Sequence, residues 1–126
     1  MEPNDEMDEM ELAAMECVPC KGGVPALKGA ELERLEGRLG GGWRVVDEHH
    51  LEKRYEFPDY RSTLAFVNGA AEIAESQGHH PNIAFTYGRA DVTIWTHKID
   101  GLTESDFVLA AKLDRGLELL KSEGAV

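Results

Sequence analysis

Alternating side-chain character over residues Ala90–His97 places the tightest constraint on how this chain can fold. The two alternating sets are Ala90, Val92, Ile94 and Thr96, and Asp91, Thr93, Trp95 and His97. Because successive side chains of a strand point to opposite faces, the segment is predicted to be a strand whose first set packs on helices. The second set, which holds one aromatic residue, is expected to border solvent, a ligand or a partner sheet.

The remaining patterns predict three helices alternating with two hairpins. The predicted elements are a helix at Ala30–Leu39, strands at Trp43–Val46 and His50–Phe57, a helix opened by Pro58 and ending near Gln77, strands at Ile83–Tyr87 and Ala90–His97, and a last helix to about Lys121. The last helix is preceded by Thr-Glu-Ser-Asp, which has the form of an N-terminal cap with an acid at the third helical position. This order predicts an α+β fold, with a four-stranded antiparallel sheet and three helices on one face.

The N-terminal part of the chain differs in character from the rest. Residues Met1–Glu16 are rich in Asp and Glu and contain no Lys or Arg. They are interpreted as a solvated, frayed tail, within which a short helix could form over Met7–Glu16. Glycines and prolines then predict an extended connector up to residue 29. We therefore divide the chain into an acidic tail with its connector, residues 1–29, and a folded domain, residues 30–126.

The connector carries the only two cysteines of the chain, Cys17 and Cys20. A single C-x-x-C pair is a weak signal, because a structural zinc site usually needs four ligands. His49 and His50, interpreted as solvated turn residues, could complete such a site, but no pattern brings them near. No chemical role is favoured for the pair, and a metal site and a redox or crosslinking role remain alternatives.

Charge and hydropathy exclude several classes of protein. The formal net charge of -11 argues against nucleic-acid binding through phosphate neutralisation. No apolar run approaches the ~20 residues that a membrane span requires. The acidic N-terminus lacks the basic and apolar regions of a signal peptide, so a cytoplasmic location is expected.

Three of the five histidines lie between Glu75 and Asp106. His79 and His80 follow the predicted middle helix, and His97 ends the alternating strand. Histidine can both give and take a proton near neutral pH, because its ordinary pKa lies closest to that range. The cluster therefore predicts acid–base chemistry on a small molecule.

The spacing of these residues resembles that of the pterin-4a-carbinolamine dehydratases. The matching positions are Glu75, His79, His80, Pro81, Tyr87, His97 and Asp106. The resemblance covers about Ala30–Lys121. It implies the α+β fold described above, with homodimers formed through the sheets and sometimes homotetramers. It also implies that neither a metal nor a redox cofactor is needed.

The reaction implied by the resemblance is dehydration of 4a-hydroxytetrahydropterin, the pterin carbinolamine, to quinonoid dihydropterin and water. The same resemblance places this reaction in tetrahydrobiopterin recycling, with an aromatic amino acid hydroxylase as a source of substrate. It implies that His79 and His97 form the proton-transfer pair and that His80 binds the pterin. Histidines suit both proton transfers, since a general acid must protonate the poor hydroxide leaving group and a base must accept the nitrogen proton.

Four further residues are expected by resemblance to support the site. Glu75 would hold a histidine tautomer by a hydrogen bond, and Asp106, fixed by the helix cap, would orient His97 or the pterin ring. Pro81 would shape the histidine loop. Trp43 would stack on the pterin.

Two other functions remain open from the sequence. One is a non-enzymatic interaction module, because the family includes a member that stabilises the dimerisation of a transcription factor. The other is a metal-binding domain, because three histidines with an acid are typical of zinc and iron ligand sets.

Overall fold

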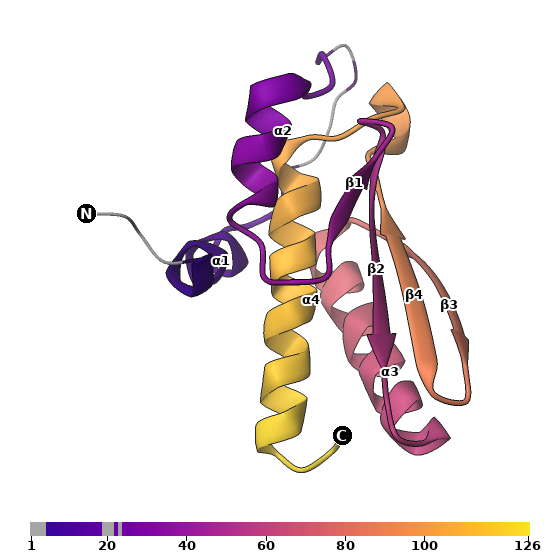
Figure 1. The fold of residues 1–126 in the computed structure, drawn as a ribbon. Coiled ribbons are helices and arrows are strands. Elements are labelled where there is room, and N and C mark those ends of the chain that lie inside the picture. Colours follow the sequence, from indigo (N-terminus) through magenta and orange to yellow (C-terminus); the bar gives the residue numbers. More distant parts are fainter. Residues whose placement is uncertain (1–4, 19–21, 23) are drawn as a thin grey trace.

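A computed structural model describes residues 5–18, 22 and 24–126 of the chain (Figure 1). Its elements are α1 (Asp5–Ala14), α2 (Gly29–Glu36), β1 (Arg44–Val46), β2 (His50–Glu56), α3 (Tyr60–Gln77), β3 (Asn82–Thr86), β4 (Arg89–Ile94), the 3₁₀ helix η1 (His97–Ile99) and α4 (Glu104–Ser122). None of the helices in these ranges is both long and apolar enough to cross a bilayer.

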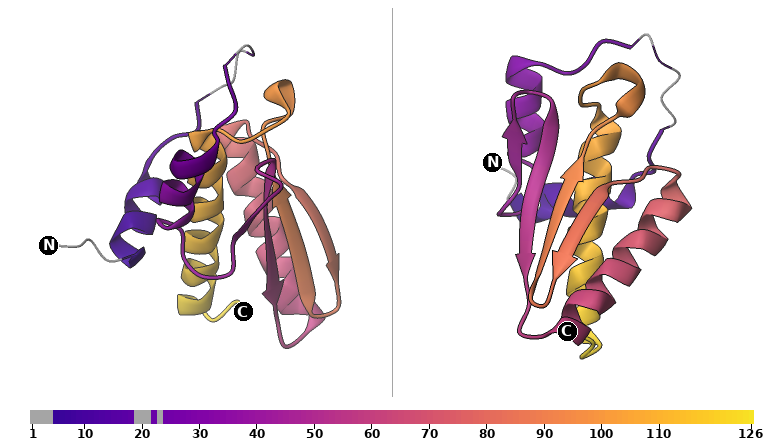
Figure 2. Two further views of the ribbon diagram at one scale, coloured as in Figure 1. Left: turned by 45° about the horizontal axis from the view of Figure 1, so that its top comes forward. Right: turned by 90° about the vertical axis from the view of Figure 1, so that its right-hand side faces the viewer.

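The four strands form one antiparallel sheet in the order β1-β2-β4-β3. The alternation predicted for β4 is confirmed, because Ala90, Val92 and Ile94 are at most 1% exposed. Helices α2, α3 and α4 lie on the face into which these side chains point (Figures 1 and 2). The predicted α+β fold class, with its four-stranded antiparallel sheet, is therefore confirmed.

Helix α3 begins two residues later than predicted and ends as predicted. Its first residue is Tyr60 rather than Pro58. Asp59 caps the N-terminus, and the Asp59 carboxylate accepts a hydrogen bond of 2.8 Å from the Ser62 amide. Gly78 ends the helix in the left-handed conformation, with φ of 62°. Glycine adopts this conformation without steric cost, and here it turns the chain sharply out of the helix into the histidine pair.

The strand predicted over Ala90–His97 ends earlier than expected. Regular pairing stops at Ile94, after which Thr96 makes an isolated bridge to Gly101 across a tight loop. His97 opens the 3₁₀ helix η1 within that loop. The prediction that His97 lies at the end of a strand is thus wrong, because the loop closes on itself instead of continuing along β2.

The short helix that the sequence allowed over Met7–Glu16 is present as α1, but the prediction that this region is a solvated, frayed tail is wrong. This helix crosses α4 on the side away from the sheet (Figures 1 and 2) and buries Leu12 completely in the hydrophobic core. The Lys112 ammonium of α4 donates a hydrogen bond of 2.8 Å to the carbonyl of Ala13. A lysine at a helix C-terminus satisfies a carbonyl that has no partner within the helix.

A buried polar cluster around Asp114 of α4 joins three layers of the fold. The Asp114 carboxylate accepts hydrogen bonds from the Trp43 indole N–H (2.9 Å), the Lys53 ammonium (2.8 Å) and the Tyr55 hydroxyl (2.5 Å). On the α1 side, the Glu9 carboxyl accepts a hydrogen bond of 2.6 Å from the Gly40 amide. Burial, followed by the hydrogen bond to Asp114 and its negative charge, raises the pKa of Glu9 from 4.5 to about 8.

We expect α1 docking to weaken as pH rises, because Glu9 must then ionise beside Asp114. The folded-state pKa of Glu9, about 8, lies above the unfolded value, even though Lys53 and the Gly40 amide oppose the shift. The stability that uncharged Glu9 contributes is thus fully present below about pH 4.5. It is lost as the pH rises from there to about pH 8. Urea denaturation should show Glu9→Gln gaining free energy of unfolding over the wild type across this window. The exposed Glu11→Gln should keep the wild-type slope.

Candidate active site

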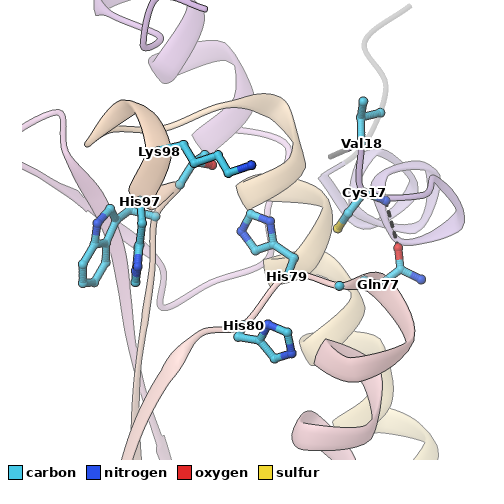
Figure 3. A pocket seen from close by; sticks show the side chains of 10 residues that line it. Cys17, Val18, Gln77, His79, His80, His97 and Lys98 are labelled. Atoms are coloured by element: carbon cyan, nitrogen blue, oxygen red, sulfur yellow. Dashed lines mark hydrogen bonds between the residues drawn. The ribbon is translucent and has the colours of Figure 1, made fainter. Parts of the chain in front are cut away.

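One pocket lies where the end of α3 meets the loop after β4 (Figure 3). Its volume is about 290 Å³, close to the lower end of the range for small-molecule sites. The lining residues are Cys17, Val18, Gln77, Gly78, His79, His80, Trp95, Thr96, His97 and Lys98. All three histidines singled out from the sequence thus line the same cavity.

His79 is held by the buried first turn of α4. Its Nε2 lies 2.7 Å from Oδ1 of Asp106, whose side chain is fully buried. The other carboxylate oxygen accepts hydrogen bonds of 2.8 Å from the Thr96 hydroxyl and from the Thr103 amide. Asp106 is also the third residue of α4, where the helix dipole favours a negative group.

This geometry sets the tautomer of His79. A carboxylate can only accept a hydrogen bond, so the neutral ring places its proton on Nε2 and its lone pair on Nδ1. The capping acid predicted for α4 is confirmed as a cap. The sequence analysis expected Asp106 to orient His97 or the pterin ring, but the histidine that it contacts is His79.

His80 is fixed more loosely than His79. Its Nε2 lies 2.7 Å from Oε1 of Glu75, but the two side chains are 61% and 80% exposed. The expected hydrogen bond between Glu75 and a histidine is present, and the histidine is His80. Exposed pairs of this kind are weak, because water competes for both partners.

His97 forms an aromatic wall with Trp95. The two ring centroids lie 4.4 Å apart and the rings are tilted by 32°. His49 packs against Trp95 at 5.4 Å between ring centroids, and its Nε2 lies 2.6 Å from Oδ1 of Asp100. His49 and His50 are therefore half-buried supports of the wall, and their interpretation as solvated turn residues is wrong.

Trp43 and Tyr87 lie outside the pocket. Trp43 is buried in the core, where it contacts Asp114, so the expected stacking of Trp43 on a pterin has no support in this geometry. Tyr87 is 65% exposed in the turn between β3 and β4. Pro81 follows His80 directly in the loop that leads into β3, as the sequence analysis expected.

The sequence analysis missed the part of the pocket that the N-terminal segment supplies. Cys17 and Val18 line it, although no local pattern links them to the histidines. Burial raises the pKa of the Cys17 thiol to about 11, so the thiol is protonated at neutral pH and is a poor nucleophile. Cys20 lies outside the described residues, so the C-x-x-C pair as a unit stays untested.

The geometry does not support the alternative of a metal site built from the histidine cluster. Within the described ranges, no group of three or more His, Cys, Asp or Glu side chains is placed to hold a metal ion. The acids that contact the pocket histidines instead act as hydrogen-bond partners of single rings.

The fold and the pocket define a small α+β protein with a cavity lined by three histidines. The sequence model of the family described as Pterin 4 alpha carbinolamine dehydratase matches residues 25–116. The chain therefore belongs to the pterin-4a-carbinolamine dehydratase family, which confirms the resemblance seen in the sequence.

Individual relatives agree with this assignment. A Rubrobacter xylanophilus protein, provisionally named a pterin-4-alpha-carbinolamine dehydratase, is 65% identical over 105 residues, which cover 83% of this chain and 97% of that protein. The crystal structure of a transcriptional coactivator/pterin dehydratase from Brucella melitensis matches with a TM-score of 0.69 at 32% identity, covering 73% of this chain and 98% of that one. A pterin dehydratase-like protein identified as a RuBisCO assembly factor in the alpha-carboxysome matches with a TM-score of 0.53 at 29% identity, covering 60% of this chain and 89% of that one.

Proposed function

We propose that this protein dehydrates 4a-hydroxytetrahydropterin to quinonoid dihydropterin and water. The observation that carries the proposal is that His79, His80 and His97 line one pocket and that a buried carboxylate holds one of the rings. Membership of the family supports the same substrate class. We further propose that the reaction serves tetrahydrobiopterin recycling and that the protein acts as a homodimer.

Two proton transfers and one bond cleavage make up the proposed reaction. The N5 proton of the pterin is removed, and its bonding electrons form a double bond between N5 and C4a. The bond from C4a to the hydroxyl oxygen breaks, and the oxygen takes a proton to leave as water. The oxidation level of the substrate does not change, so the reaction consists of proton transfers alone.

His79 is suited to be the base in this scheme. With Nε2–H donated to Asp106, Nδ1 carries the lone pair that accepts the N5 proton. Asp106 is a positioning residue, since it stabilises the positive ring that forms, as the acid of a Ser-His-Asp triad does.

His97 is suited to be the acid. Its ring lines the pocket beside Trp95 and is exposed, so water can return a proton to it after each turnover. Trp95 offers an aromatic edge and face for a flat heterocycle, and His80 offers a further polar contact. Each proton-transfer residue typically contributes about 10²–10⁴-fold in rate.

A direct assay tests the proposal. Pure protein is mixed with freshly generated pterin carbinolamine, and the ultraviolet change that accompanies dehydration is followed against buffer. Acceleration that disappears in the His79→Gln variant supports the reaction. A rate equal to that of buffer would remove the enzymatic proposal.

An interaction role is the second candidate, and the solved relatives favour it. One is a transcriptional coactivator/pterin dehydratase, and another is a RuBisCO assembly factor. A protein that is inert in the carbinolamine assay but still pairs with a second protein would support this reading. We rank it second, because assembly does not require Asp106 to be buried against a pocket histidine.

A further inference from the structure

Hydrogen bonds to Gln77 and Ser105 hold Cys17 and Val18 of the N-terminal segment at the pocket. The Cys17 amide donates to the Gln77 side-chain oxygen (2.8 Å), and the Cys17 thiol donates to the Ser105 carbonyl (3.5 Å). The Val18 amide donates to the Ser105 hydroxyl (2.8 Å), which in turn donates to the Val18 carbonyl (3.3 Å). Both polar backbone groups of Val18 are thus satisfied by one buried side chain.

These anchors belong to the two turns that also carry the acid–base residues. Gln77 ends α3, two residues before His79, and Ser105 precedes Asp106 in the first turn of α4. Further back along the chain, the burial of Leu12 holds the whole segment to the domain. The segment is therefore fixed relative to the histidines.

Val18 is an exposed apolar side chain at a fixed position on the cavity. It is 71% exposed and lines the pocket. Single exposed valines are common on protein surfaces. Val18 differs from them because hydrogen bonds to its amide and its carbonyl fix its backbone beside a cavity. In the view of Figure 3, Cys17 and Val18 lie on one side of His79 and His97 lies on the other.

We propose that Cys17 and Val18 form a substrate-binding wall, with Val18 in contact with the pterin on the side away from His97 and with Ser105 as the residue that positions the wall. This inference rests on the proposed function for the identity of the ligand. The wall is uncharged, because it consists of a valine side chain and a thiol. It therefore suits a neutral, flat heterocycle, which it would hold between an apolar surface and the rings of Trp95 and His97.

Binding and turnover of the full chain test this wall separately. The probe is 7,8-dihydrobiopterin, titrated against protein by calorimetry, alongside the carbinolamine assay. Val18→Asp should raise Kd and KM at least about fivefold while kcat stays within about twofold, since a buried charge disfavours the bound state but touches no reacting atom. Val24→Asp is the matched control, because Val24 is 53% exposed and does not line the pocket.

The positioning role of Ser105 has its own variants. Ser105→Ala should raise Kd and KM in the same direction as Val18→Asp, and Ser105→Thr, which keeps a hydroxyl, should restore them. Ser122→Ala, in the last turn of the same helix, is the matched control and should behave as wild type. Circular dichroism and thermal melting identify any variant that has lost its fold.

The outcomes separate this inference from the proposed reaction. If the wild type binds the probe and both Val18→Asp and Ser105→Ala keep the wild-type Kd, the proposed wall is overturned. The proposed reaction is not affected by that result. Binding without turnover in the wild type overturns the reaction, while the Kd values of the variants still decide on the wall. If the wild type neither binds 7,8-dihydrobiopterin nor turns over the carbinolamine, both proposals are overturned. If it turns over the carbinolamine without binding the probe, unchanged KM in both variants overturns the wall alone.

Discussion

Replacing His79 by glutamine is expected to lower kcat by about 10²–10⁴-fold, with little change in stability. Glutamine keeps an N–H donor for Asp106, which lies 2.7 Å from the imidazole in the wild type, but its amide cannot accept a proton as imidazole does. His97→Ala is expected to cause a loss of similar size, because the proposed acid is removed. Steady-state kinetics with the carbinolamine measure both effects.

An exposed residue of α3 provides the control for these variants. Glu72→Gln introduces the same glutamine outside the pocket, and it should keep a kcat near that of the wild type. Near-native rates in both His79→Gln and His97→Ala would contradict the proposed roles. Thermal melting shows whether a lost rate reflects lost chemistry or lost fold.

Replacing Asp114 by alanine is expected to cost about 3–5 kcal/mol of unfolding free energy. The Lys53 ammonium, the Tyr55 hydroxyl and the Trp43 indole N–H would all lose their acceptor inside the protein. Removing one partner of a buried charged pair costs far more than removing an exposed one, because the other charge stays desolvated. Urea denaturation monitored by circular dichroism measures the loss.

An exposed aspartate provides the matched control for Asp114. Asp91 on β4 forms ion pairs with Arg54 and Arg89 at the surface, so Asp91→Ala should cost no more than about 1 kcal/mol. Equal losses in the two alanine variants would show that the buried cluster is not what joins β2 to α4. Asp114→Ala should also lower the pKa of Glu9, because a nearby negative charge and hydrogen-bond partner disappear.

Periodicity in the sequence predicted the buried face of β4 well. The alternation in β4 is a local pattern imposed by burial on one side of the strand, so it is visible in the sequence. The docking of α1 was not predicted in this way, because the sequence of the helix is dominated by acids. Among residues 9–14, whose side chains the structure describes, Leu12 alone is fully buried. The docking of the helix depends on a surface of α4 and on a Glu9 carboxyl that holds its proton beside Asp114, and neither can be seen in a local window.

The spacing of the site residues predicted which of them meet but not how they pair. His79, His80 and His97 do share a pocket. The pairing of Glu75 with His80 follows from the left-handed turn at Gly78, which breaks the helical spacing that would favour His79. Hydrogen bonds between distant segments, such as that from His79 to Asp106, depend on tertiary packing and leave no periodic trace.

Helix α4 separates the pocket from the C-terminal residues, where a label could be attached. Its first turn holds Asp106 at the pocket, and its 19 residues span about 28 Å before the C-terminus (Figure 1). A fluorophore, affinity handle or solid support attached after Val126 would therefore stand off from the histidines by the length of the helix. Attachment through Cys17 would place the same group at the pocket that the three histidines line.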